Sequence, residues 1–131
     1  MLKRVAEICR LPFSSRVITL EDWSKSRKAP PSAVVVDCHA IAADSIRPGR
    51  TSAACGSASY RYIEAAVNSA MHGRISAIAT APINKKSLNL AGINYPGHTE
   101  ILAKLRNAKR VCMMLASDEI TVSLVTIHTA L

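Results

Sequence analysis

The fold class is decided by the stretch SASYRYIEAAVNSAMHG at residues 57–73, with the run ISAIA at residues 75–79 close behind it. Apolar and small residues recur at intervals of three and four, which predicts a helix over residues 57–72 with one apolar stripe. The stripe contains Tyr62, Ile63, Ala66, Val67 and Ala70. Gly73 is the expected end of this helix, and the alternating run 75–79 predicts a short strand. The stretch therefore indicates a helix followed by a strand.

Toward the amino terminus the pattern is weaker. Residues 1–10 are compatible with one end of a helix, and residues 11–32 mix proline, paired serines and scattered charge, which is typical of irregular chain. The β-branched run from Ala33 to Asp37 predicts a buried strand. Residues 46–56, with Pro48 and two glycines, are expected to form a loop.

Toward the carboxyl terminus the pattern predicts two helices and then two strands. A short helix starts with Asn84 as its cap and ends before Gly92. A second begins near His98 or Thr99 and buries its apolar side, which holds Ile101, Leu102 and Leu105. Strands are expected over residues 111–115 and 120–127. The alternation predicts an α/β sheet in a single domain over residues 1–131, with residues 1–32 as an irregular lead-in.

Composition excludes several classes of protein. The chain has 131 residues, of which 49% are hydrophobic and 20% charged, so a folded core is expected and intrinsic disorder is disfavoured. No apolar run approaches the roughly 20 residues that cross a bilayer, so no membrane span is expected. The first ten residues have no apolar segment of the kind found in a secretory signal, which favours a cytoplasmic protein.

The net charge of +8 is evenly spread. Residues 1–50 hold nine basic and five acidic side chains, and residues 51–131 hold eight and four, so each part carries +4. The few aromatic residues are scattered rather than interleaved with basic ones, as a nucleic-acid groove would require. We therefore expect no nucleic-acid partner. A basic surface also attracts small phosphorylated anions.

The four cysteines show no metal or redox spacing. Cys9, Cys38, Cys55 and Cys112 are far apart and form no C-x-x-C pair. Four reduced thiols, mostly packed as small apolar side chains, are expected in a chain of this kind.

Two segments carry polar residues that suit a ligand site. The first runs from Thr80 through Asn84 and Lys85 to the sequence PGHTE at residues 96–100, where helix starts follow turns. Free backbone N–H groups, the helix dipole, the His98 imidazole and the Thr99 hydroxyl would suit an anionic substrate group. The alternative is that Thr99 only caps its helix and that His98 fills a turn.

The second segment is the end of the last predicted strand, where Thr126 and Thr129 flank His128. A neutral imidazole there could be a metal ligand or an acid/base group, and the alternative is a hydrogen-bonded structural histidine. His39 and His72 are interpreted as structural. The chain has no G-x-x-x-x-G-K-[ST], G-x-G-x-x-G, G-x-S-x-G or H-E-x-x-H motif.

Taken together, the two segments resemble the 4-hydroxythreonine-4-phosphate dehydrogenase family of pyridoxal phosphate (vitamin B6) biosynthesis. Several motifs occur in the same order and at compatible spacing from Arg47 onward. They are TAPINK at 80–85, AG at 91–92, GHTEILA at 97–103, MML at 113–115 and VTIHTAL at 125–131. Residues 47–131 form the family-like region, and residues 1–32 match the family pattern poorly.

The resemblance implies an NAD-dependent oxidation of the substrate's secondary hydroxyl to a β-keto acid, which decarboxylates to 3-amino-2-oxopropyl phosphate. By the family pattern, His98 and Thr99 contact the substrate and His128 binds a divalent metal ion, either zinc, magnesium or cobalt. Such an ion acts as a Lewis acid on the hydroxyl and on the enolate. Lys85 is not assigned. The implied fold is a partial isocitrate/isopropylmalate dehydrogenase-like α/β fold, and the family forms homodimers with the active site between subunits.

The departures from the family pattern concern length. Family members are more than twice as long, and their other metal ligands and cofactor-binding portion lie beyond the point that corresponds to Leu131. We therefore expect a fragment that carries part of the substrate side of the site and is inactive alone. Two alternatives stay open: a related dehydrogenase of phosphorylated threonate or erythronate, and a non-catalytic module that binds a phosphate ligand or a partner chain. The dehydrogenase interpretation requires His98 and His128 to face the same hollow.

Overall fold

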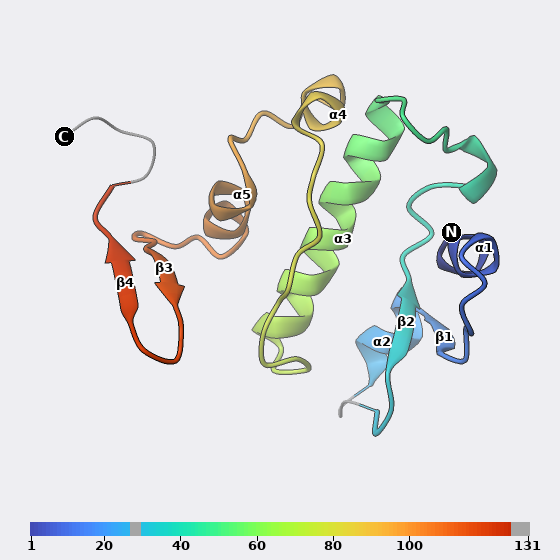
Figure 1. Ribbon diagram of the computed structural model, residues 1–131, viewed down its shortest axis with the longest axis horizontal. Coiled ribbons are helices and arrows are strands. Elements are labelled where there is room, and N and C mark those ends of the chain that lie inside the picture. The colour runs from blue at the N-terminus through green and yellow to red at the C-terminus, as the bar shows by residue number, and fades with distance from the viewer. Residues whose placement is uncertain (27–29, 127–131) are drawn as a thin grey trace.

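Residues 1–26 and 30–126 are described by the computed structural model of this chain (Figure 1). The elements, in order, are α1 (Leu2–Ile8), β1 (Arg16–Thr19), α2 (Leu20–Lys25), β2 (Val34–Asp37), the 3-10 helix η1 (Ala43–Ser45), α3 (Ala53–Met71), α4 (Lys85–Leu90), α5 (His98–Leu105), β3 (Met113–Ala116) and β4 (Thr121–Leu124). The long helix α3 stands in the middle, with β1 and β2 on one side and α5 on the other (Figure 1). The predicted α/β class is confirmed.

The strands form two separate pairs in the described residues. β1 and β2 are parallel, with Arg16 opposite Val34, and β3 and β4 form an antiparallel hairpin in which Met113 is opposite Leu124. The hairpin lies at the end of the molecule away from β1 and β2 (Figure 1). The β2 strand is half-buried rather than fully buried as predicted, because among residues 1–26 and 30–126 only β1 pairs with it.

The predicted strand over residues 75–79 is wrong. Residues 77–84 form no helix or strand, and this segment runs alongside α3 (Figure 1). The alternation of side chains in this segment reflects packing against the core: Ile78 packs there, while its neighbours Ala77 and Ala79 are exposed. A strand also needs a neighbouring strand for its hydrogen bonds, and the described part of the chain places none beside it.

The expectation of irregular chain over residues 11–32 is also wrong in part, because β1 and α2 lie there. The local signals are present in the sequence. Thr19 is the N-cap of α2 and its Oγ1 accepts a hydrogen bond of 3.0 Å from the backbone N–H of Asp22. β1 then gains its stability from pairing with β2, a long-range contact that a local pattern does not reveal.

The helices α3, α4 and α5 share the main hydrophobic core. Leu88 of α4 and Ile101 of α5 are fully buried, and both belong to one cluster with Ile63 and Val67 of α3. The predicted stripe is thus confirmed for Ile63 and Val67, whereas Tyr62 is exposed. Helix α3 begins at Ala53, earlier than predicted, because the Ser52 side chain caps it by accepting from the backbone N–H of Cys55.

Two further predictions about the helices are confirmed. Gly73 ends α3 with a positive φ of 67°, and Arg74 N–H donates to the Ser69 carbonyl at 2.9 Å. Asn84 is the N-cap of α4. In the described part of the chain, no helix is both long and apolar enough to span a membrane.

Candidate functional site

The candidate site lies at the amino end of α5. His98 is the first residue of this helix and Thr99 follows it, and both are half-buried. The N-cap is Gly97, which has no side chain with which to satisfy the first-turn N–H groups. Thr99 is therefore not the cap, so the alternative in which its hydroxyl only caps the helix is wrong.

This arrangement leaves hydrogen-bond donors at a helix end that favours negative charge. The first-turn N–H groups, the His98 imidazole and the Thr99 hydroxyl can each donate to an oxygen of a ligand. Glu100, in the same turn, is acidic, and its Oε2 lies close enough to Gly97 that a Cβ built there would meet it at 3.5 Å. An anionic ligand must therefore bind beside a carboxylate, which favours a ligand that also offers a donor or a cation.

The preceding turn contributes less than the sequence suggested. Asn84 Oδ1 accepts a hydrogen bond of 2.8 Å from the backbone N–H of Ser87, so this side chain stabilises the start of α4. Lys85 and Lys86 are exposed on α4. Helices α4 and α5 nevertheless pack against the same helix, because Leu88 of α4 and Ile101 of α5 belong to one hydrophobic cluster with residues of α3.

His128 lies outside the described residues, so its predicted role as a metal ligand and its convergence with His98 stay predictions. Among residues 1–26 and 30–126, no three His, Cys, Asp or Glu side chains are placed together so that they could hold a metal ion. The described residues therefore do not by themselves provide a donor set for a divalent ion.

The remaining histidines have local partners. His72 ends α3, and its Nδ1 lies 2.7 Å from the Asn68 carbonyl oxygen. His39 follows β2 with a left-handed φ of 46°, and its Nδ1 lies 3.6 Å from Asp37 Oδ2. These contacts fit the structural interpretation of both residues.

All four cysteines are free thiols, as predicted. Their packing differs from the expectation, because Cys9 and Cys112 are exposed and only Cys38 is buried. Burial, together with the neighbouring Asp37 carboxylate, raises the pKa of the Cys38 thiol above its ordinary value. A raised pKa keeps this sulfur protonated near neutral pH, so it is a poor nucleophile.

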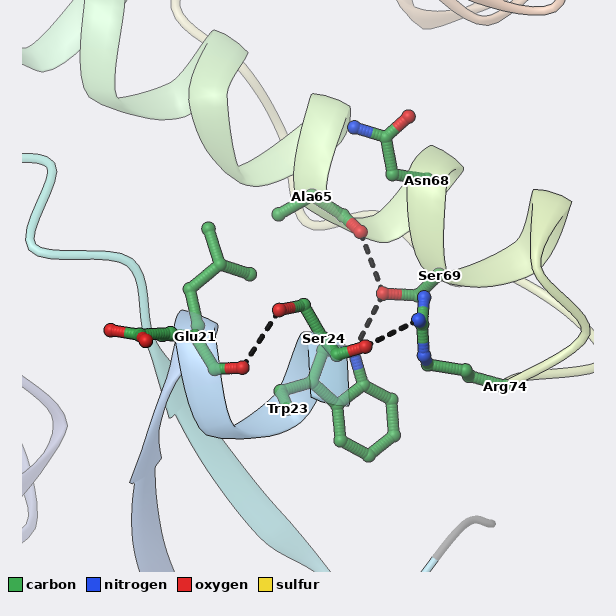
Figure 2. Close-up of a pocket in the computed structure, with 8 residues that line it drawn as sticks. Glu21, Trp23, Ser24, Ala65, Asn68, Ser69 and Arg74 are labelled. Atoms are coloured by element: carbon green, nitrogen blue, oxygen red, sulfur yellow. Dashed lines mark hydrogen bonds between the residues drawn. The ribbon is translucent and has the colours of Figure 1, made fainter. Parts of the chain in front are cut away.

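A hollow of about 400 Å³ lies between α2 and the carboxyl-terminal half of α3, and Figure 2 shows its lining. The buried Trp23 donates its Nε1–H to Ser69 Oγ at 2.7 Å, and Ser69 in turn donates to the Ala65 carbonyl. Arg74 donates to the carbonyl oxygens of Ser24 and Ser26. The polar groups of Trp23, Ser69 and Arg74 are thus hydrogen-bonded within the protein. They hold α2 against α3 and do not indicate a ligand site.

Sequence reasoning missed one feature next to the candidate site. Tyr60 of α3 and Tyr95, which precedes the GHTE motif, stack with ring planes 5° apart and centroids 6.4 Å apart. The sequence showed these aromatic residues only as scattered. The available signal was the position of Tyr60 on the same helical face as Ile63 and Val67.

The fold and the sequence both match known proteins. The crystal structure of 4-hydroxythreonine-4-phosphate dehydrogenase from Klebsiella pneumoniae superposes with a TM-score of 0.81 at 32% identity, covering 99% of this chain and 39% of that one. The 4-hydroxythreonine-4-phosphate dehydrogenase of Trichlorobacter lovleyi is 38% identical over 131 residues, which are 99% of this chain and 38% of the relative. The D-threonate 4-phosphate dehydrogenase of Salmonella typhimurium is 39% identical over 112 residues, which are 86% of this chain and 34% of the relative.

These relatives place the chain in a class: it has the α/β fold of dehydrogenases named for phosphorylated four-carbon substrates. The family model described as pyridoxal phosphate biosynthetic protein PdxA matches residues 1–131. The chain belongs to the PdxA family. It spans less than half of the length of the relatives that it matches.

Proposed function

We propose that this chain carries the substrate-binding part of an NAD-dependent dehydrogenase that acts on 4-hydroxythreonine 4-phosphate in pyridoxal phosphate biosynthesis. The single observation that carries the proposal is the placement of His98 and Thr99. Both lie in the first turn of α5, where no side chain caps the helix, in a chain that belongs to the PdxA family. Their donors are thus available to substrate oxygens.

In the proposed reaction, the carbon that bears the secondary hydroxyl transfers a hydride to NAD and the hydroxyl gives up its proton to a base, so that a ketone forms. The resulting β-keto acid then loses carbon dioxide and leaves 3-amino-2-oxopropyl phosphate. The role of this chain in the reaction is to bind and orient the substrate, because correct positioning contributes strongly to catalysis. His98 and Thr99 hold substrate oxygens, and the substrate's ammonium group balances the nearby Glu100 carboxylate.

His128 is proposed as one ligand of a divalent metal ion, either zinc, magnesium or cobalt. When bound, such an ion acts as a Lewis acid that lowers the pKa of the substrate hydroxyl. A catalytic metal site ordinarily uses about three protein ligands, and the described residues bring no such set together. We therefore propose that NAD, the remaining metal ligands and the second subunit of a homodimer are needed for turnover, and that this chain is inactive alone.

Three further proposals concern the complete fold, the charge of the substrate and the location. The matched region is 38% of the Trichlorobacter lovleyi protein, so that relative is about two and a half times as long. The complete fold is proposed to be isocitrate/isopropylmalate dehydrogenase-like. The substrate is a small phosphorylated molecule, to which the net charge of +8 is complementary. A cytoplasmic location is proposed because phosphorylated metabolites of this kind are processed there.

A second candidate substrate is D-threonate 4-phosphate. The relative from Salmonella typhimurium that is named for it is 39% identical over 112 residues, and the Trichlorobacter lovleyi relative named for 4-hydroxythreonine 4-phosphate is 38% identical over 131 residues. 4-Hydroxythreonine 4-phosphate carries an amino group where D-threonate 4-phosphate carries a hydroxyl group. The Glu100 carboxylate beside Gly97 favours the substrate with the ammonium group. The alternative outside the enzymes is a non-catalytic module that binds a phosphate ligand.

The test is calorimetric titration of the 131-residue chain with 4-hydroxythreonine 4-phosphate and, separately, with D-threonate 4-phosphate, with the full-length Trichlorobacter lovleyi relative as the positive control. We expect His98→Gln and Thr99→Val each to weaken binding about tenfold or more, since a hydrogen bond to a charged group contributes about 1.5–3 kcal/mol. His72→Gln is the matched control. Unchanged affinity in both site variants would overturn the proposal.

NAD reduction is measured in the same samples with zinc, magnesium and cobalt. Activity of the positive control, together with none from this chain, supports the proposal that the chain is inactive alone. Turnover by this chain alone would contradict it. This chain can also be mixed with the part of a relative that it does not cover. If it then binds a phosphate ligand but the mixture still shows no NAD reduction, the result would favour the non-catalytic module.

A further inference from the structure

The stacked pair Tyr60 and Tyr95 joins two parts of the chain that meet only in the folded protein. Tyr60 belongs to α3, and Tyr95 lies in the segment between α4 and α5. Their rings are nearly parallel, with 5° between the planes and 6.4 Å between the centroids. This distance is within the range in which aromatic pairs attract each other beyond simple burial. Both rings are half-buried and pack against the core cluster.

The helix that carries Tyr60 is well fixed. Ile63 and Val67, on the same face of α3, are buried in the core with Leu88 and Ile101. Tyr60 therefore has a defined position and can act as a rigid support for whatever stacks on it. Burial, helped by the Glu64 carboxylate and by Tyr95, also raises the pKa of Tyr60, which agrees with a ring held against the protein.

The segment that carries Tyr95 has few other attachments. Within the described part of the chain, residues 94–97 donate no backbone hydrogen bond, and α5 starts at His98 with Gly97 as an N-cap that has no side chain. The nearest backbone attachments are Ile93 N–H to the Leu88 carbonyl at 2.9 Å and Ile101 N–H to the Gly97 carbonyl at 3.4 Å. Ile93, just before this segment, packs against the core cluster, and within the described residues 94–97 it is Tyr95 whose side chain packs there and stacks on Tyr60 of α3.

We propose that Tyr60 is a positioning residue: through its stack on Tyr95 it fixes the turn Pro96–Gly97 and thereby the orientation of His98 and Thr99. Tyr60 does not touch the substrate. The inference rests on the proposed function only where it concerns substrate affinity. The geometric part concerns the order of the first turn of α5 and holds whether or not that turn binds a ligand.

The test compares Tyr60→Phe, which keeps the flat ring, with Tyr60→Leu, which keeps apolar volume but removes the ring. Ile78→Ala is the matched control, because Ile78 packs against the same core cluster without being part of the tyrosine stack. Backbone order parameters of His98 and Thr99 are measured by NMR on the 131-residue chain without ligand. Each variant is first shown to fold by circular dichroism, and Tyr95→Leu replaces Tyr60→Leu if that variant does not fold.

We expect the order parameters of His98 and Thr99 to fall in Tyr60→Leu from the rigid value of about 0.85 toward 0.6. They should stay at the original value in Tyr60→Phe and in Ile78→Ala. Equal order in Tyr60→Leu and the unsubstituted chain would overturn the inference. An equal loss in Ile78→Ala would overturn it as well, because that loss would reflect the core in general.

The second readout is the affinity for 4-hydroxythreonine 4-phosphate, followed through the ring signals of His98. Loss of the stack should weaken binding about three- to tenfold, in line with the usual strength of an aromatic pair, and Tyr60→Phe should restore it. If the unsubstituted chain does not bind this compound, the proposed function fails while the order parameters still decide the role of Tyr60. If it binds and Tyr60→Leu binds equally well, the positioning role is wrong.

Discussion

Gly56 of α3 lies directly against the backbone of α4 at Ser87. A methyl group at Gly56 would overlap the Ser87 carbonyl oxygen and would lie 2.8 Å from the backbone nitrogen of Leu88. The contact is continued by the backbone N–H of Ser52, which donates to Ser87 Oγ at 3.3 Å. This close approach seats α4 on α3 and so places the fully buried Leu88 in the core that also supports α5.

Gly56→Ala should therefore destabilise the chain strongly. The added methyl group meets backbone atoms, which cannot rotate away, so the two helices must separate. We expect a loss of about 3 kcal/mol or more in the free energy of unfolding, at the upper end of the range for overpacked sites. Urea denaturation followed by circular dichroism measures it. Ser57→Ala, at an exposed position on the same helix, is the control, and equal stability of the two variants would contradict the close approach.

Ser69→Ala should destabilise the junction between α2 and α3. It leaves the indole N–H of the buried Trp23 without its partner Ser69 Oγ. An unsatisfied buried donor costs about 1–3 kcal/mol. Because Trp23 is the only tryptophan, its fluorescence reports the change at this site during denaturation. Ser24→Ala, which removes an exposed hydroxyl that donates to the Glu21 carbonyl, should have a much smaller effect.

Alkaline pH should destabilise the folded chain through Tyr60. Burial raises the pKa of Tyr60 in the folded state above the ordinary tyrosine value of about 10. The unfolded state therefore releases this proton first, so the stabilising effect is fully present below pH of about 10 and is lost as pH rises through the folded-state pKa. The free energy of unfolding of Tyr60→Phe should fall less over this window. Parallel curves for the two proteins would contradict the shift.

The outer hairpin should promote self-association at high concentration. On one of its faces Leu115 is 60% exposed and its partner Val122 is 42% exposed. Exposed apolar patches of this kind favour association, and the hairpin edges are unpaired in the described residues. Leu115→Lys combined with Val122→Lys should shift light scattering toward the monomer. Ser123→Lys, on the opposite face, is the control and should have little effect. A monomeric unsubstituted chain at high concentration would refute this prediction.

The sequence by itself determined three of the helices, α3, α4 and α5, and the family. The periodicity of residues 57–72, the cap at Asn84 and the apolar spacing of Ile101, Leu102 and Leu105 are local signals, so α3, α4 and α5 were predicted correctly, apart from the start of α3. Motif order identified the PdxA family. The same motifs named His98 and Thr99 as substrate-binding candidates, and that role stays a prediction.

Only the tertiary structure decided which extended segments pair and which side chains meet. Residues 75–79 alternate like a strand, yet they pack along α3, while β1, with a weak local signal, pairs with β2. Tyr60 and Tyr95 were two scattered aromatic residues until the fold stacked them. The physical reason is that helix hydrogen bonds join neighbours in the sequence, whereas strand pairing and ring stacking join residues whose proximity depends on how the whole chain packs.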